Sequence, residues 1–283
     1  MSIELDYALP SATLCDYVTL FYRFRADVPL FEDMERADHA QLRLRLTPGG
    51  ARYRFVDGYE QDAADAHILG PTTGAFKVTA PGPVYLFGAG ITPAGWAALL
   101  GNDASSMVNR VVDVAEIFGD GIGTAIGRLA AAPDLAAMVA CGEEIVRDLL
   151  YAQPAEALDF VAHVDAWLCA GPSPEVADLA AATGLSQRQI ERKCKALYGA
   201  PPKLLARKYR ALRAAVALVA DGTSLDDAVG RGFYDQSHMN REIKQFTGHT
   251  PGQIKSEPGV LALLTIAHRY ALGGKVHPII SDT

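Results

Sequence analysis

Two stretches in the C-terminal half of the chain, residues 173–199 and 223–251, repeat one order of apolar and polar positions. Each begins with a residue suited to cap a helix, continues with a short apolar face, and reaches a glycine followed by an apolar residue. A second capping residue then precedes a helix whose apolar residues recur every three or four positions. This order, present twice about fifty residues apart, predicts two helix-turn-helix units.

In the first unit, Ser173 is the predicted cap of a helix that has Pro174 at its first position, where the missing N–H costs nothing. Gly184 forms the turn, and Ser186 caps the second helix. The outward face of that helix carries polar side chains able to bond base edges or nearby phosphates. These residues are Gln187, Arg188, Glu191 and Arg192.

In the second unit, Ser224 caps the first helix, Gly232 ends it, and Asp235 caps the helix that follows. The outward residues of this second helix are Gln236, Ser237, Asn240 and Arg241. Three lysines nearby are predicted phosphate contacts, which position a protein on DNA without reading sequence. They are Lys203, Lys208 and Lys244. The alternative for either unit is an ordinary helical hairpin with a solvated polar face.

Residues 201–220 form a predicted helix between the two units. Twenty residues at about 1.5 Å rise span roughly 30 Å, which is close to the ~34 Å of one DNA turn. The second helices of the two units are therefore expected to enter successive major grooves on one side of the duplex.

Residues 156–255 resemble the AraC/XylS family of bacterial transcription regulators. The resemblance rests on LAAATGLSQRQIERKCKALYGAPP, on Arg210 and Arg213, and on GFYDQSHMNREIKQFTGHTP. This chain departs from the family pattern in the first unit at Lys193-Cys194, and in the second at Met239 and Ile243. The departures affect core positions and not the outward faces. The resemblance implies sequence-specific binding to double-stranded DNA and transcriptional regulation, with RNA polymerase as a further partner.

Residues 1 to about 120 alternate short β-branched or aromatic runs with Gly/Pro turns, a pattern typical of an antiparallel sheet or small barrel. The predicted strands are residues 17–24, 41–46, 51–56, 67–69, 76–79 and 84–88. Strict alternation in residues 41–46 predicts one face in a core and one in water. This half resembles, at fewer positions, the β-rich sensor domains attached to such DNA-binding modules, through Tyr17-Val18, Gly70-Pro71 and residues 88–96.

The expected fold class is therefore α+β, in three parts. Residues 1–153 form a sensor and dimerisation domain, helical from about 120. Residues 154–257 form the DNA-binding domain. Residues 258–283 form an apolar helix followed by a loose tail. The apolar face of this helix must be buried against another part of the protein, such as the sensor domain. The helices of 120–152 bury their stripe on the sheet or against a second subunit, so a homodimer is expected, with a monomer as the alternative.

Control by an unknown small molecule or a protein is expected to act through the sensor. Four aromatic side chains are candidates for lining an apolar effector pocket, with plain core packing as the alternative. They are Phe76, Tyr85, Phe87 and Trp96. His39 and His67 stand apart from other histidines in the sequence, so no metal site is expected, and no cofactor is predicted.

The charge distribution separates the two halves. Of 26 basic and 33 acidic residues, 13 basic and 8 acidic ones fall within 173–256, which leaves 13 and 25 elsewhere. The C-terminal module is thus basic and the remainder acidic, which favours docking on DNA through the module alone.

Enzyme motifs are missing from the sequence: it has no Gly-x-Ser-x-Gly, P-loop or Cys-x-x-Cys. The run GDGIGTAIG lacks the preceding buried strand of a dinucleotide site. We therefore expect no enzyme. No run is apolar enough to span a bilayer and no signal peptide is recognisable, so a cytoplasmic location is expected. The alternative function is a protein-interaction module of the antitoxin or anti-regulator type, in which DNA binding is secondary.

Overall fold

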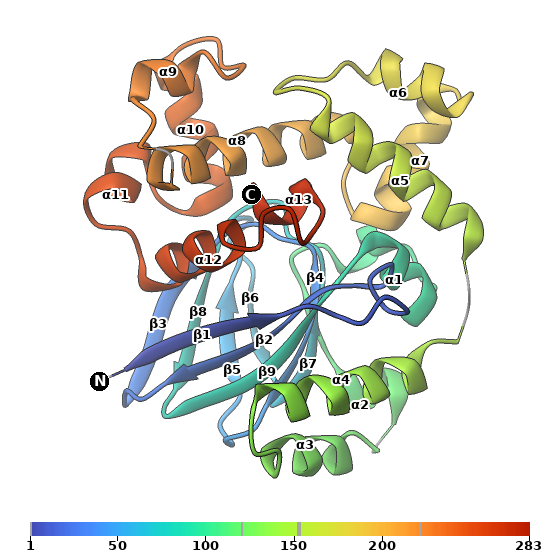
Figure 1. The fold of residues 1–283 in the computed structure, drawn as a ribbon, viewed down its shortest axis with the longest axis vertical. Helices are drawn as coiled ribbons and strands as arrows, with labels where there is room; N and C mark the ends of the chain where they lie inside the picture. The colour runs from blue at the N-terminus through green and yellow to red at the C-terminus, as the bar shows by residue number, and fades with distance from the viewer. Residues whose placement is uncertain (1, 120, 152–153, 221) are drawn as a thin grey trace.

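The computed structural model describes residues 2–119, 121–151, 154–220 and 222–283. Figure 1 shows a β-rich half formed by the first part of the chain and a helical half formed by the second, with the last helices returning across the sheets. The fold is α+β, as predicted, with antiparallel sheets followed by an all-helical region.

The described strands form two antiparallel sheets. The larger has the order β1-β2-β9-β4-β7-β10 and the smaller the order β3-β8-β5-β6. The bounds are β1 Ile3–Ala8, β2 Val18–Ala26, β3 Leu30–Glu35, β4 Ala40–Arg45, β5 Ala51–Arg54, β6 Glu60–Ala63, β7 Ala66–Leu69, β8 Phe76–Pro81, β9 Val84–Ile91 and β10 Val111–Asp113. The sequence pattern missed β1, β3, β6 and β10, which are short or rich in charged residues.

The two faces of the larger sheet bury different partners. Phe21 and Phe87 pack with the helices that follow the strands, whereas Leu5 and Phe24 pack with Phe31 and other residues of the smaller sheet. Because successive side chains of a strand point to opposite faces, strands such as β2 and β9 contribute to two cores.

Strand β4 corrects the expectation of one face in water. All six of its residues are buried. Leu42 and Leu44 belong to the core under the helices, while Gln41, Arg43 and Arg45 lie between the sheets at 4–6% exposure. The alternation was read correctly, but the polar face borders an internal cavity.

Helices cover the outer face of the larger sheet. They are α1 Pro93–Leu99, the 3-10 helix η1 Ala104–Met107, α2 Val114–Phe118, α3 Ile122–Ala130 and α4 Leu135–Leu149. Asp134 caps α4, and Met138, Ile145 and Val146 pack on the strands, so the apolar stripe is buried within the chain. The predicted helix start at residue 120 lies outside the described residues.

The helical half consists of α5 to α13. The bounds are α5 Ala155–Cys169, α6 Val176–Thr183, α7 Gln187–Tyr198, α8 Pro202–Ala220, α9 Leu225–Val229, α10 Gln236–Thr247, α11 Pro251–Ser256, α12 Val260–Tyr270 and α13 Pro278–Ser281. Figure 1 shows α8 bridging the α6–α7 pair and the α9–α10 pair. The predicted domain boundary at residue 153 lies outside the described residues.

The C-terminal segment packs on both halves of the molecule. Leu261 and Leu264 of α12 lie against the core between the sheets, as the sequence suggested. The expected loose tail is wrong, because Ile279 and Ile280 of α13 are buried in the core around α5. None of the helices in the described ranges combines the length and apolar character that crossing a bilayer requires.

We predict that Gly142→Val destabilises the fold. A Cβ at this position in α4 would lie 2.5 Å from the ring of Phe87 and 3.2 Å from that of Phe21. Forcing the helix off the sheet costs about 1–3 kcal/mol, which urea unfolding measures. Gly123→Ala in α3 is the control, because a Cβ there has no neighbour within 4 Å. It should leave stability unchanged or raise it by up to about 1 kcal/mol; equal losses in both variants would contradict the assigned close packing.

Candidate functional site

The second helix of the first unit, α7, presents the predicted polar face to solvent. Ser186 and Gln189 form a capping box at its start. Ile190 and Cys194 are fully buried beneath it. The outward residues are exposed: Gln187, Arg188, Glu191 and Arg192.

The corresponding helix of the second unit, α10, has the same organisation. The Asp235 carboxylate accepts a hydrogen bond from the His238 backbone N–H at 2.6 Å. Met239, Ile243 and Phe246 are completely buried in the core with α8. Gln236, Ser237, Arg241 and Lys244 are exposed, and Asn240 is half-buried. Within the described residues, neither Arg192 nor Arg241 is in an ion pair.

Of the predicted phosphate contacts, Lys203 and Lys244 are exposed, but Lys208 is not. Its side chain is buried, and Nζ donates to the backbone carbonyls of Asp38 at 3.3 Å and Thr72 at 3.5 Å. Burial lowers the pKa of Lys208 to about 8. The prediction for Lys208 is therefore wrong in this arrangement, because the inner face of α8 rests on the β-rich half.

A buried carboxylate on α10 joins this helix to α8, and sequence reasoning overlooked it. Glu242 is 2% exposed and accepts from Arg207 Nε and Arg210 Nη2, both at 2.6 Å, with His238 Nε2 at 3.2 Å. Burial alone would raise the pKa of Glu242, but Arg207 and Arg210 outweigh it and the pKa is lowered. A Glu at the i+4 position from His238 and facing the arginines of α8 was the available signal.

The arginines of α8 also reach the first unit. Arg210 Nη1 donates to Ser173 Oγ at 2.6 Å, and Arg213 Nη2 donates to the Leu168 carbonyl at 2.6 Å. Arg210 therefore connects Glu242 of the second unit with Ser173 at the start of the first. These bonds fix the two outward faces relative to one another. The predicted cap at Ser173 is wrong, because α6 begins after Glu175 and Pro174 lies outside the helix.

The end of α10 is held by the β-rich half through the backbone. The Ala37 N–H donates to the Phe246 carbonyl at 2.7 Å, and the Ala75 N–H donates to the Gln245 carbonyl at 2.8 Å. Both acceptors are carbonyls of the last helical turn, which have no partner within the helix. The side chain of Ala37 is fully buried in the core of the second unit.

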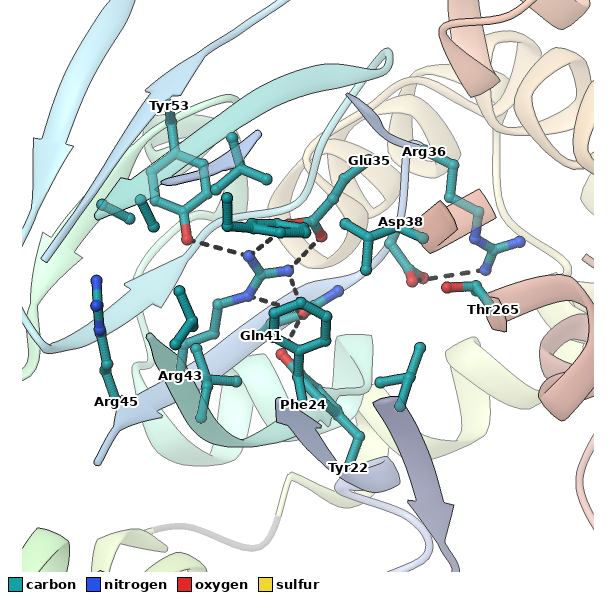
Figure 2. Close-up of a pocket in the computed structure, with 18 of the residues that line it drawn as sticks. Tyr22, Phe24, Glu35, Arg36, Asp38, Gln41, Arg43, Arg45, Tyr53 and Thr265 are labelled. Atoms are coloured by element: carbon teal, nitrogen blue, oxygen red, sulfur yellow. Dashed lines mark hydrogen bonds and ion pairs between the residues drawn. The ribbon is translucent and has the colours of Figure 1, made fainter. Parts of the chain in front are cut away.

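A cavity of about 90 Å³ lies between the two sheets. Its walls are mainly apolar, with Phe24, Phe31 and Val78 from the sheets and Leu261 from α12. Figure 2 shows Arg43 at its centre, surrounded by Tyr53, Glu35 and Gln41. Because one wall comes from α12, the cavity is completed only by the last part of the chain.

Arg43 has all of its donors satisfied. Nη1 donates to Glu35 Oε1 at 2.8 Å and to the Tyr53 hydroxyl at 3.0 Å, and Nη2 donates to Gln41 Oε1 at 2.7 Å. Burial alone would lower the pKa of Arg43, but Glu35 raises it well above its usual range. Arg45 donates to the carbonyls of Gly50 and Pro81. These two arginines are structural.

The four aromatic residues predicted to line an effector pocket do not line this cavity. Phe76 is buried among Tyr53 and Phe55, and Phe87 stacks on Phe21 under α4. The Tyr85 hydroxyl contacts Met138, and the Trp96 indole N–H donates to the Asn102 carbonyl. Plain packing, the alternative considered, holds for these side chains. The cavity lies instead beside the alternating polar residues of β4, which are Gln41, Arg43 and Arg45.

The two histidines have separate, neutral roles. His67 Nδ1 donates to the Ala64 carbonyl at 2.7 Å, so Nε2 accepts from the Tyr53 hydroxyl at 2.8 Å. His39 Nε2 is 2.7 Å from the hydroxyl of Tyr209 on α8. Burial lowers both pKa values to about 3. Across the described residues, no three His, Cys, Asp or Glu side chains gather as a metal site would require.

Comparisons with known proteins agree with this organisation. Residues 179–257 match a family described as a helix-turn-helix domain. A search of the curated proteins found no match.

Similar solved structures include ToxT from Vibrio cholerae O395 bound to (E)-4-(8-methylnaphthalen-1-yl)but-3-enoic acid, 8% identical with a TM-score of 0.47, covering 89% of this chain and 98% of that chain. Unsaturated fatty acid-bound ToxT from Vibrio cholerae strain SCE256 is 9% identical with a TM-score of 0.46, covering 82% and 94%. The AraC-like transcriptional activator CuxR is 12% identical with a TM-score of 0.31, covering 81% and 91%.

We predict that Glu242→Gln lowers the free energy of unfolding by about 2–4 kcal/mol. The substitution leaves the buried guanidinium of Arg210 without its counter-charge. Urea unfolding measures the loss. Glu191→Gln on the exposed face of α7 is the control and should change stability by less than about 0.5 kcal/mol. If both variants were equally stable, Glu242 would not hold α10 to α8.

We further predict that His67 makes stability fall as the pH is lowered. Its pKa is about 3 in the folded state, against 6.5 for an exposed imidazole ring. The unfolded chain therefore takes up the proton first, and stability is lost as pH falls from about 6.5 towards 3, by up to about 1.4 kcal/mol per pH unit.

Urea unfolding at pH 7, 6, 5 and 4 measures this slope, and His67→Gln should remove this share of it. The comparison between variants matters because burial raises the pKa of Asp165 to about 7, which gives an opposite slope in the same window. His163→Gln, on the surface-facing side of α5, is the control. A slope equal in the wild type and in His67→Gln would rule out the buried neutral ring.

Proposed function

We propose that this chain is a DNA-binding transcriptional regulator of the AraC type, which reads a specific duplex sequence through α7 and α10. Residues 179–257, which contain both helices, match a helix-turn-helix domain. The observation that carries the proposal is the pair of exposed polar faces on two capped helices, joined by α8 within one domain. In this proposal Arg188 and Arg192 contact one major groove, and Gln236, Ser237, Asn240 and Arg241 contact the next.

The charges support docking through this module. Arg192 and Arg241 are exposed without ion-pair partners among the described residues, so binding phosphate or base edges would break no existing pair. Lys203 and Lys244 are exposed and remain in the proposal as phosphate contacts. Each phosphate neutralised by such a side chain releases counterions, which makes binding steeply salt-dependent.

Control by a small molecule in the cavity between the sheets is the second part of the proposal. The cavity is lined by Arg36 and Asp38, and Ala37 between them packs in the core of the second unit. A ligand that shifts this segment would act directly on the carbonyls at the end of α10. A ligand in the cavity would therefore act on α10 through the segment Arg36–Asp38 alone.

Several further expectations stay predictions. They are the homodimer, RNA polymerase as a partner, a cytoplasmic location, the absence of enzymatic activity, and the division into residues 1–153, 154–257 and 258–283. The apolar stripe of α4, which suggested a dimer contact, is buried on the sheet of the same chain.

The decisive experiment is selection of bound fragments from the genome of the source cell, followed by mobility shifts at increasing salt. A regulator retains a small set of fragments and competes poorly with unrelated DNA, with a steep salt slope. Retention of all fragments alike, or none, would instead favour the protein-interaction module.

We predict that Arg192→Ala and Arg241→Ala each weaken binding to the selected site by about 1–3 kcal/mol and relax preference at one base position. Lys244→Ala should weaken all sequences alike and reduce the salt slope by about one charge. Mobility shifts on the site and on single-base variants measure these effects. Arg52→Ala, an exposed arginine of β5, is the charge-matched control. A control variant as weak as Arg192→Ala would remove the proposed contacts.

A further inference from the structure

The most exposed large hydrophobic side chain in the described ranges is that of Tyr234, in the turn between α9 and α10. It is 92% exposed, whereas the next one, Tyr151, is 64% exposed. The Tyr234 hydroxyl has no hydrogen-bond partner in the described part of the chain. Exposure of a single apolar residue does not by itself indicate a partner. The backbone that carries the ring, and its place beside α10, are therefore the observations that count.

The backbone on both sides of Tyr234 is fixed. The preceding residue, Phe233, is 8% exposed, and the guanidinium carbon of Arg210 lies 5.0 Å from its ring centre. The following residue, Asp235, caps α10. The Tyr234 N–H itself donates to His238 Nδ1 at 3.3 Å. The turn thus holds the ring out in solvent, and a contact made there would cost little backbone ordering.

Tyr234 stands at the end of α10 that the β-rich half does not hold. The opposite end of the helix accepts the backbone bonds from Ala37 and Ala75. The 12 residues of α10 span roughly 18 Å, so the turn lies well away from those bonds. Figure 1 shows α9, which leads into the turn, on the side of the molecule opposite the sheets. A DNA duplex can therefore reach this turn without meeting the sheets.

The chemistry of the turn suits the sugar–phosphate backbone. The N-terminal residues of the second helix of such a unit contact base edges, and in the proposed function these are Gln236 and Ser237. A residue just before them lies at the rim of the groove, where the phosphates run. Tyrosine is among the side chains that bond phosphate oxygens. Arg231 in the same turn is exposed and adds positive charge, and the Asp235 carboxylate is engaged as the cap.

We propose that Tyr234 is a phosphate contact, whose hydroxyl donates to a phosphate oxygen at the rim of the groove that α10 enters. The inference rests on the proposed function for the placement of α10 in a major groove. The contact expresses no base preference, but it fixes the register at which Gln236 and Arg241 meet the bases. It differs from a lysine contact in one measurable respect. A tyrosine hydroxyl carries no charge at neutral pH, so it releases no counterion.

The test is a set of mobility shifts with the full chain, on the selected genomic site, on its single-base variants and on unrelated duplex. We expect Tyr234→Phe to weaken binding about ten-fold, because a hydrogen bond to a charged oxygen is lost. The loss should be equal on all duplexes, and the salt slope should stay that of the wild type. Lys244→Ala, in contrast, should reduce the slope. Tyr59→Phe, at a tyrosine 43% exposed between β5 and β6, is the matched control and should bind as the wild type does.

A second measurement locates the phosphate. In a series of duplexes, one phosphate at a time is replaced by an uncharged methylphosphonate. One replacement should weaken the wild type about as much as Tyr234→Phe does, and should cost that variant little more, because the two changes remove the same bond. Thermal unfolding of Tyr234→Phe should match that of the wild type, since the hydroxyl has no partner within the described residues to lose.

The inference and the proposed function fail in different ways. Unchanged binding by Tyr234→Phe, a loss confined to one base pair, or no methylphosphonate whose effect depends on Tyr234 would overturn the phosphate contact. Selective binding in the same experiments would leave the proposed function standing. Equal binding of all duplexes, with the loss in Tyr234→Phe retained, would overturn the reading of a specific sequence and leave the contact. Binding to no duplex at all would overturn both.

Discussion

The segment Arg36–Asp38 is the constraint on which the arrangement of the two halves depends. Arg36 and Asp38 line the cavity, while Ala37 between them is completely buried in the core of the second helix-turn-helix unit. Any residue larger than alanine at position 37 would push α10 away from the sheets. A movement of Arg36 or Asp38 would displace Ala37 and so disturb the packing of that core.

Around this segment, polar bonds join the two halves in addition to the apolar contacts of Leu20 and Ala94 with the core around α5. Lys208 and Tyr209 of α8 bond to the Asp38 carbonyl and the His39 ring, and the Ala37 N–H of the β-rich half donates to the Phe246 carbonyl of α10. Such bonds are directional, and a partner lost by a small shift is left buried and unsatisfied. A shift of the two halves against one another therefore costs free energy at each of these bonds.

The sequence revealed the helical half well because its signals are local. Caps at Ser186, Ser224 and Asp235 and the apolar stripes are set by residues three or four positions apart, and α7, α9 and α10 begin where these caps place them. The first helix of the first unit begins after Glu175 and not after Ser173, and α9 ends at Gly230 and not at Gly232. The six strands with β-branched or aromatic runs were also recognisable. Strands such as β3, LFEDME, were not, because their charged residues find partners from distant elements.

The cavity could not be predicted from the sequence for the same reason, because it depends on residues from distant elements. The alternation of β4 shows which residues share a face, but only the second sheet and α12 determine that this face is enclosed. Lys208 looked like a phosphate contact because its burial depends on a carbonyl of Asp38, which is 170 residues away. Glu242 gave a helical spacing signal, yet its burial follows from how α8 crosses α10.

Helix α12 makes the cavity between the sheets depend on both ends of the chain. Its residues Leu261, Thr265 and Arg269 close a space whose other walls were laid down within the first 90 positions. In a chimera that combined the β-rich half of this chain with the helical half of another protein, the residues that α12 contributes to the cavity would come from that other protein. An exchange of the two halves at residues 152–154 would therefore replace only part of the cavity's lining.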